Sequence, residues 1–280
     1  MDKFTEILRS ITLGIVQGLT EFLPVSSSFH LRFVPSILGW PEIGLAFSAF
    51  LHLGTLLAIF IYFGKDLYSL VVNSYREAFL PDFSIVRLCN TLGFKILIGT
   101  IPAVAIGFVF HDQIEILDKN QILTSICLIG VALLLWFIDA QPIKKENLQD
   151  NISKREALAI GIGQACALIP GVSRSGATIG VGRTLGYSRE EAARFSFLLG
   201  TPVILGAGLL EILKVMKHSA QLEVGIGTCL IGCLAAAITG YFVIGFFLKI
   251  LQNTSLLPFI IYRIIIGSIS LFMVLKGWIR

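Results

Sequence analysis

The sequence reads Pro170-Gly171-Val172-Ser173-Arg174-Ser175-Gly176-Ala177-Thr178 where an otherwise apolar segment, about 157–182, is interrupted. One arginine and three hydroxyl groups therefore stand on a glycine-flanked turn in surroundings suited to lipid. Backbone that is not helical is tolerated at membrane depth only where protein or a water-filled cavity surrounds it. We therefore expect a re-entrant helical hairpin here rather than a straight membrane span.

A second apolar segment, about 10–30, is interrupted in the same way. It reads Gln17-Gly18-Leu19-Thr20-Glu21-Phe22-Leu23-Pro24-Val25-Ser26-Ser27-Ser28-Phe29-His30. Gln17 and Glu21 are one helical turn apart and share a face, and Pro24 ends that helix. Three serines and His30 follow the proline. This segment predicts a second re-entrant hairpin.

The composition indicates an all-α polytopic membrane protein. Of its 280 residues, 55% are hydrophobic and only 14% are charged, whereas a soluble domain carries about 25% charged residues. The net charge of +4 is spread over loops and does not suggest a nucleic acid partner. We expect one integral membrane domain, 1–280. A spanning helix needs about 20 apolar residues, and six segments qualify: about 45–63, 88–110, 122–139, 195–213, 224–248 and 257–276.

Two short patterns recur at nearly one offset. Val25-Ser26-Ser27-Ser28 matches Val172-Ser173-Arg174-Ser175 at an offset of 147, and Leu53-Gly54-Thr55 matches Leu199-Gly200-Thr201 at 146. These matches favour an internal duplication of one hairpin plus three spans. Because three spans is an odd number, the second copy is inverted, and such transporter-like folds place their sites on broken helices near the midplane. The repeat halves are about 1–140 and 150–280.

Basic residues are mildly enriched in one set of loops, which lie near 64–87, 140–155, 183–194 and 249–256. Basic loops stay on the cytoplasmic side of a membrane. We therefore expect both termini on the outer side, together with a loop near 111–120.

The two hairpin turns carry charges that are costly in a membrane. An ionised carboxylate at the bilayer centre costs at least about 2.5–3.5 kcal/mol, so we expect Glu21 to be paired, metal-bound or protonated. The planar guanidinium of Arg174 matches phosphate oxygens, and the helix start that follows it would face an anion. We expect Glu21 and Arg174 to face one another. The alternatives are structural: Glu21 only neutralises Arg174, or Arg174 only satisfies backbone carbonyls.

Together the turns offer a carboxylate, a histidine, an arginine and several serines. General acid–base catalysis needs a group that titrates near neutral pH, as His30 can, and phosphoryl transfer needs mainly positioning and charge stabilisation. His52 lies in the middle of a predicted span and is interpreted as a satisfied core histidine. Arg263 lies near a helix start, where snorkelling to the interface and a function explain it equally well.

The chain resembles the bacterial undecaprenyl-diphosphatases, the bacitracin-resistance family often called BacA or UppP. The resemblance rests on the stretch from Gln17 to Glu21 that runs into the serine turn, and on Pro170 to Thr178. It implies six spans, two re-entrant hairpins and interlocked inverted repeats. It also implies hydrolysis of undecaprenyl diphosphate to the monophosphate, dependence on Mg²⁺ or Ca²⁺, and a pocket that opens to the periplasmic or outer face of the plasma membrane. The family positions fall on Glu21, Ser26, Ser27, His30, Ser173, Arg174 and Thr178.

Two positions depart from the family pattern. Gln17 stands where the family usually has glutamate, which weakens a two-carboxylate metal site and leaves Glu21 as its main ligand. Ser28-Phe29 stands where the family usually has Thr-Gly, and Phe29 could shift His30 or narrow the pocket.

We interpret the chain as a membrane lipid diphosphatase. Ser27 is the predicted nucleophile, activated through His30 or Glu21; a rival assignment keeps Ser27 as a ligand and lets His30 or an activated water attack. Glu21 orients this group or, with Gln17, holds the cation. The expected partners are a polyprenyl diphosphate lipid and the bilayer, and the sequence allows an oligomer. The alternative function is a transporter or flippase of polyprenyl phosphate. The predicted phosphate ligands are Ser26, Ser173, Arg174, Ser175 and Thr178.

Overall fold

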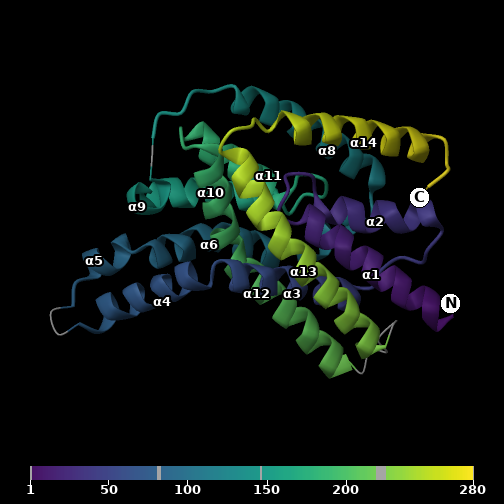
Figure 1. Ribbon diagram of the computed structural model, residues 1–280, viewed down its shortest axis with the longest axis horizontal. Coiled ribbons are helices and arrows are strands. Elements are labelled where there is room, and N and C mark those ends of the chain that lie inside the picture. Colours follow the sequence, from purple (N-terminus) through teal and green to yellow (C-terminus); the bar gives the residue numbers. More distant parts are fainter. Residues whose placement is uncertain (1, 81–82, 146, 219–224, 280) are drawn as a thin grey trace.

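The computed structural model describes residues 2–80, 83–145, 147–218 and 225–279, and within these ranges every regular element is a helix. The all-α prediction is therefore confirmed. Figure 1 shows the helices, which are α1 (Lys3–Thr20), α2 (Ser27–Leu38), α3 (Leu45–Tyr62), α4 (Gly64–Phe79), α5 (Ile85–Asn90), α6 (Leu92–Val109), α7 (His111–Asp118), α8 (Gln121–Asp139), α9 (Leu148–Asn151), α10 (Lys154–Cys166), α11 (Arg174–Thr184), α12 (Arg189–His218), α13 (Ile226–Leu251) and α14 (Leu257–Leu275).

The predicted membrane spans all coincide with helices. In the described part of the chain, α6, α8, α12, α13 and α14 are each long and apolar enough to cross a membrane. The sixth, α3, meets that test together with α4, from which it is bent by 78°. Large apolar side chains such as Phe108, Phe137 and Phe242 are exposed on these helices, as expected where lipid is the solvent. The chain is a multi-pass membrane protein.

Two stretches that the sequence predicts as loops contain helices instead. The predicted loop 64–87 includes all of α4 and the start of α5, and the stretch near 111–120 contains α7. The loop prediction was wrong because these stretches lack the long apolar run of a spanning helix, although they can still form shorter helices. In α4 the exposed apolar residues Tyr68, Val71, Tyr75 and Phe79 recur at helical spacing, which makes the helix amphipathic.

Both predicted hairpins are present, and their turns have the same unusual backbone. The first hairpin joins α1 to α2 and the second joins α10 to α11. Ser26 has φ 72° and Ser173 has φ 75°, and each stands at the N-cap position of the second helix of its hairpin. Positive φ is uncommon for a residue other than glycine. Its recurrence at an offset of 147 residues supports an internal duplication.

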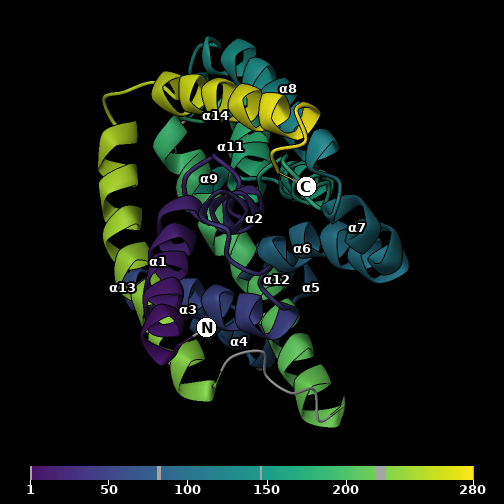
Figure 2. The same ribbon diagram turned by 90° about the vertical axis from the view of Figure 1, so that its right-hand side faces the viewer.

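The two halves interlock through reciprocal packing. The first helix of each hairpin packs on a span of the other half, α1 on α13 and α10 on α6. In both contacts the backbones meet at a glycine: a Cβ on Gly14 would lie 2.4 Å from the Gly232 oxygen, and one on Gly161 would lie 2.1 Å from the Gly99 oxygen. Figure 2 shows α1 beside α13, and α8 beside α14 above them. Each hairpin is therefore held by a span of the other half, the first by α13 and the second by α6.

Arg263 of α14 ties the two hairpin turns together. Its side chain is fully buried, and its guanidinium donates to the oxygens of Leu128 at 3.1 Å, Pro24 at 2.9 Å and Gly171 at 2.9 Å. Pro24 belongs to the first turn and Gly171 to the second. A buried charge is tolerated when it is hydrogen-bonded. Arg263 therefore does not snorkel to the interface but fixes the place where the turns meet.

Candidate functional site

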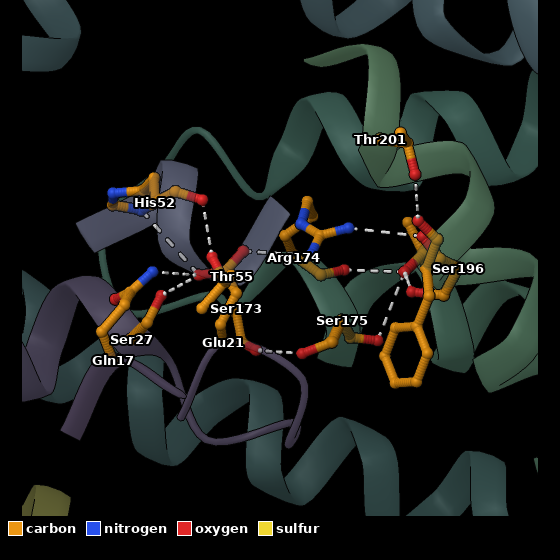
Figure 3. Close-up of polar contacts among 12 residues, drawn as sticks. Gln17, Glu21, Ser27, His52, Thr55, Ser173, Arg174, Ser175, Ser196 and Thr201 are labelled. Atoms are coloured by element: carbon orange, nitrogen blue, oxygen red, sulfur yellow. Dashed lines mark hydrogen bonds and ion pairs between the residues drawn. The ribbon is translucent and has the colours of Figure 1, made fainter. Parts of the chain in front are cut away.

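Glu21 and Arg174 meet where the two turns come together (Figure 3). Glu21 follows the last residue of α1, and Arg174 is the first residue of α11. The Arg174 Nη2 donates to Glu21 Oε1 at 3.0 Å, and the side chains are only 14% and 6% exposed. The expectation that these groups face one another is confirmed. Each supplies the counter-charge that the other needs at membrane depth.

The second carboxylate oxygen of Glu21 accepts a hydrogen bond from the Ser27 hydroxyl. Ser27 Oγ donates to Glu21 Oε2 at 2.7 Å, and Gln17 Nε2 donates to the same atom at 3.1 Å. A distance of about 2.5–2.7 Å is typical of a hydroxyl bound to an ionised carboxylate. A nucleophile next to a base within hydrogen-bond reach is the arrangement that activates a serine. Of the two activation routes left open by the sequence, this geometry favours Glu21.

Arg174 lies against α12, and one of its guanidinium nitrogens has no hydrogen-bond partner. Its Nη1 donates to the Ser196 oxygen at 3.3 Å, and its Nε is buried without a hydrogen-bond partner. A Cβ on Gly200 would lie only 1.6 Å from Nη1, so the absent side chain makes room for the guanidinium. A buried donor without a partner is costly, and an oxygen of a bound phosphate would satisfy it.

Two helices begin at this site. Ser27 is the first residue of α2 and Arg174 the first of α11, at corresponding places in the two repeats. The first amides of a helix have no partner within it, and together with the helix dipole they favour an anion. The Ser26 side chain makes no capping bond to α2, whereas Ser173 Oγ accepts from the Gly176 amide at 3.2 Å. The amides at the start of α2 thus lack a side-chain cap.

His30 turns away from the carboxylate. Its Nδ1 is 2.7 Å from the Ser26 oxygen and its Nε2 is 2.7 Å from the Tyr262 hydroxyl. The ring is 5% exposed and stacks on Tyr262. A carbonyl only accepts, so Nδ1 carries the proton and Nε2 accepts from Tyr262. His30 thus links α2 to α14, and its catalytic role stays a prediction.

The hydroxyls of the second turn bond within the protein. Ser173 Oγ is 3.2 Å from Ser175 Oγ, and Ser175 Oγ donates to the Leu23 oxygen of the first turn at 2.9 Å. These bonds join the hairpins. Binding of phosphate by Ser173 and Ser175 stays a prediction.

Thr178 and Ser26 are also engaged. Thr178 is fully buried, donates to the Arg174 oxygen at 2.8 Å and shares a hydrogen bond with the Ser196 hydroxyl. Thr178 therefore connects the Arg174 backbone to Ser196 of α12. Ser26 Oγ is 3.3 Å from Ser28 Oγ. Their role as phosphate ligands stays a prediction.

His52 lies beside Glu21, and its interpretation as a core histidine was wrong because the side chain is not buried, although its Nδ1 has a partner in the Ser48 oxygen. Its side chain is 32% exposed, and Nε2 lies 3.8 Å from Glu21 Oε2. With Ser28 it also lines a cavity of about 110 Å³. The recurring Leu-Gly-Thr pattern was a usable signal, because it follows His52 in α3 and contains Gly200 in α12. In each half the helix with this pattern lies next to one charged residue of the site: α3 lies next to Glu21 and α12 next to Arg174.

Glu21 and Gln17 are the residues predicted to hold a divalent cation. Within the described residues, no group of three or more His, Cys, Asp or Glu side chains could hold a metal. Gln17 Nε2 donates to the single carboxylate, and Gln17 Oε1 is buried without a hydrogen-bond partner. Mg²⁺ is commonly held by one or two carboxylates together with substrate phosphates and water. The oxygen donors of Glu21 and Gln17 are of the kind that such a cation needs, and the cation site stays a prediction.

The sequence is similar to proteins of one family over most of its length. Residues 10–269 match the model of the bacitracin resistance protein BacA family. Three relatives are named undecaprenyl-diphosphatase. That of Geotalea daltonii is 42% identical over 97% of this chain and 100% of the relative. That of Alcanivorax borkumensis is 42% identical over 94% and 97%, and that of Chlorobium chlorochromatii is 40% identical over 98% and 99%.

Proposed function

Because this chain belongs to the bacitracin resistance protein BacA family, whose relatives here are named undecaprenyl-diphosphatase, we propose that it hydrolyses undecaprenyl diphosphate to undecaprenyl phosphate and inorganic phosphate. The reaction recycles the carrier lipid of cell-wall synthesis and confers resistance to bacitracin. The observation that carries the proposal is the contact of Glu21 with both the Ser27 hydroxyl and the Arg174 guanidinium.

The first step forms a phosphoserine. Ser27 Oγ attacks the terminal phosphorus while its proton passes to Glu21, and the bond from that phosphorus to the bridging oxygen breaks. Undecaprenyl phosphate leaves. Arg174 stabilises the charge on the transferring oxygens, which is the main task in phosphoryl transfer. The starting geometry is the Ser27–Glu21 hydrogen bond of 2.7 Å.

The second step releases the phosphate. Once Glu21 has passed its proton to the solvent, its carboxylate accepts a proton from a water that attacks the phosphoserine. The bond between phosphorus and Ser27 Oγ breaks, inorganic phosphate leaves, and Ser27 regains a proton from Glu21. The carboxylate that activates the serine is thus also placed to activate the water.

Glu21 and Gln17 would hold the divalent cation, Mg²⁺ or Ca²⁺, which neutralises phosphate charge when bound. The buried, unpartnered Gln17 Oε1 supports this assignment. The chain would act in the bacterial plasma membrane with its site open to the outer side. Glu21, Ser27 and Arg174 all come from one chain, so the proposed site needs no second copy.

The proposal is tested by measuring phosphate released from a polyprenyl diphosphate by the purified protein. We expect one phosphate per lipid, and a fall in kcat of about 10²-fold or more in Ser27→Ala, because the nucleophile is lost. Ser69→Ala, an exposed serine of α4, is the control and should keep full activity. If Ser27→Ala keeps most of its turnover, the serine nucleophile is wrong. Lipid movement across liposomes without any phosphate release would instead support a flippase.

A further inference from the structure

His52 has no role in the proposed reaction. Its ring is nevertheless held in one orientation by a hydrogen bond. Its Nδ1 lies 2.8 Å from the Ser48 oxygen one turn earlier in α3. A carbonyl only accepts, so Nδ1 donates its proton there and Nε2 is the free nitrogen. Nε2 faces Glu21 Oε2 at 3.8 Å, which is too long for a hydrogen bond.

The separation of 3.8 Å suits two ligands of one ion. Metal ions lie about 2.0–2.2 Å from nitrogen and oxygen ligands, so two donors on one ion are at most about 4.4 Å apart. Histidines that bind metals almost always donate their other ring proton to a carbonyl, carboxylate or water. His52 makes that second bond to Ser48.

Gln17 provides an independent sign of a missing ligand. Its Oε1 is buried without a hydrogen-bond partner, while its Nε2 lies 3.1 Å from Glu21 Oε2. A half-turn of the amide exchanges these two atoms. The amide oxygen would then lie beside the carboxylate, an arrangement that is favourable only with a cation between them. Arg174 occupies the other carboxylate oxygen. With the amide turned, Oε2 keeps the hydrogen bond from Ser27 and has a second lone pair for the cation.

We propose that His52 Nε2, Glu21 Oε2 and Gln17 Oε1 form the protein side of the divalent-cation site, with the imidazole in place of a second carboxylate. This inference rests on the proposed function for the presence of a cation and adds the ligand that decides which cation binds. Imidazole suits transition ions such as Zn²⁺ and Fe²⁺, whereas Ca²⁺ prefers an all-oxygen set. The imidazole therefore disfavours Ca²⁺ at this site, and Mn²⁺ is a paramagnetic probe of it.

Pulsed electron paramagnetic resonance of Mn²⁺ added to the purified protein tests the inference, because a nitrogen ligand modulates the spin echo through ¹⁴N. We expect this modulation in the wild-type protein and its loss in His52→Gln, with Mn²⁺ bound about tenfold more weakly or worse. The control is His111→Gln on α7, a histidine whose side chain is 54% exposed and whose loss should leave the signal unchanged. His52→Glu should bind Mn²⁺ without the ¹⁴N signal and gain affinity for Ca²⁺.

Two results would overturn the inference: no ¹⁴N modulation in the wild-type protein, or modulation that persists in His52→Gln. If His52→Gln fails to fold, His52→Glu takes its place, and ¹⁴N modulation that persists in that variant would equally overturn the inference. Phosphate release keeps the two proposals distinguishable. Turnover by a protein whose bound Mn²⁺ shows no nitrogen ligand contradicts the His52 site alone, and a ¹⁴N signal in a protein that releases no phosphate contradicts the proposed function alone.

Discussion

Gly200 decides where the guanidinium of Arg174 can lie. A methyl group at this position would come 1.6 Å from Arg174 Nη1. The contacted atom is the end of a flexible side chain, so Gly200→Ala should fold while the guanidinium moves. A misplacement of about 1 Å can cost about 10²-fold in rate, and we expect kcat for phosphate release to fall by that order.

Gly206→Ala is the matched control for this substitution. Gly206 lies in the same helix, and a methyl group added there would meet no neighbouring atom within 4 Å. Alanine favours helix formation over glycine by about 1 kcal/mol, so both variants should be at least as helical as the wild-type protein. Equal activity of the two variants would show that the position of Arg174 is unimportant.

At the residue scale the sequence predicts the charged centre well and its surroundings less well. Glu21, Ser27 and Arg174 stand out because polar groups in apolar segments need a reason. His52 and Gly200 are marked in the sequence by the recurring Leu-Gly-Thr pattern alone, since their roles depend on distances between α3, α12 and the hairpins. His30 stands beside the serines in sequence, yet its ring bonds to Tyr262.

At the scale of the elements, α14 holds both hairpins through Arg263. Arg263→Lys replaces a fork of donors by one ammonium group, which cannot reach Leu128, Pro24 and Gly171 at once. Each buried carbonyl left without a partner costs about 1–3 kcal/mol. We expect a lower Tm in detergent and lower activity. Arg155→Lys, at an exposed position of α10, should change neither.

The start of α10 should make stability depend on pH. Ser153 and Glu156 form a reciprocal cap, and Lys145 donates to Glu156. Burial of Glu156 opposes its ionisation, but the bonds from Lys145 and Ser153 outweigh this and lower its pKa from 4.5 to about 2. The ionised carboxylate thus stabilises the fold fully above pH 4.5, and this contribution is lost as the pH falls to about 2.

Thermal unfolding of Glu156→Gln measures this contribution. At pH 7 the variant should be less stable by about 1.5–3 kcal/mol, the usual value of hydrogen bonds to a charged group. The difference should shrink as the pH falls below about 4.5. A difference that stays constant between about pH 7 and pH 3 would contradict the ionised cap.

At the element scale the apolar spans and the broken hairpins are predictable, because length and interruption are local properties of the sequence. The helices α4, α5 and α7 are not, since none of them contains an apolar run long enough to cross a membrane. Only the spacing of Tyr68, Val71, Tyr75 and Phe79 distinguishes α4.

For the whole molecule the weak internal repeat is the most useful sequence signal. It predicts two hairpins whose turns meet, and the similar φ angles of Ser26 and Ser173 support it. It does not predict that α1 packs on α13 and α10 on α6. That exchange depends on small residues such as Gly14 and Gly161, whose importance shows only when the backbones are in contact.

The central claim is that hairpins from opposite halves act as one catalytic unit through Glu21 and Arg174. The most direct measurement is kcat/KM for phosphate release in Glu21→Gln, Arg174→Lys and the double variant. Residues that act as a unit are strongly non-additive. The account predicts that the double variant is about as slow as the slower single variant. Losses that multiply, as for two independent sites, would contradict it.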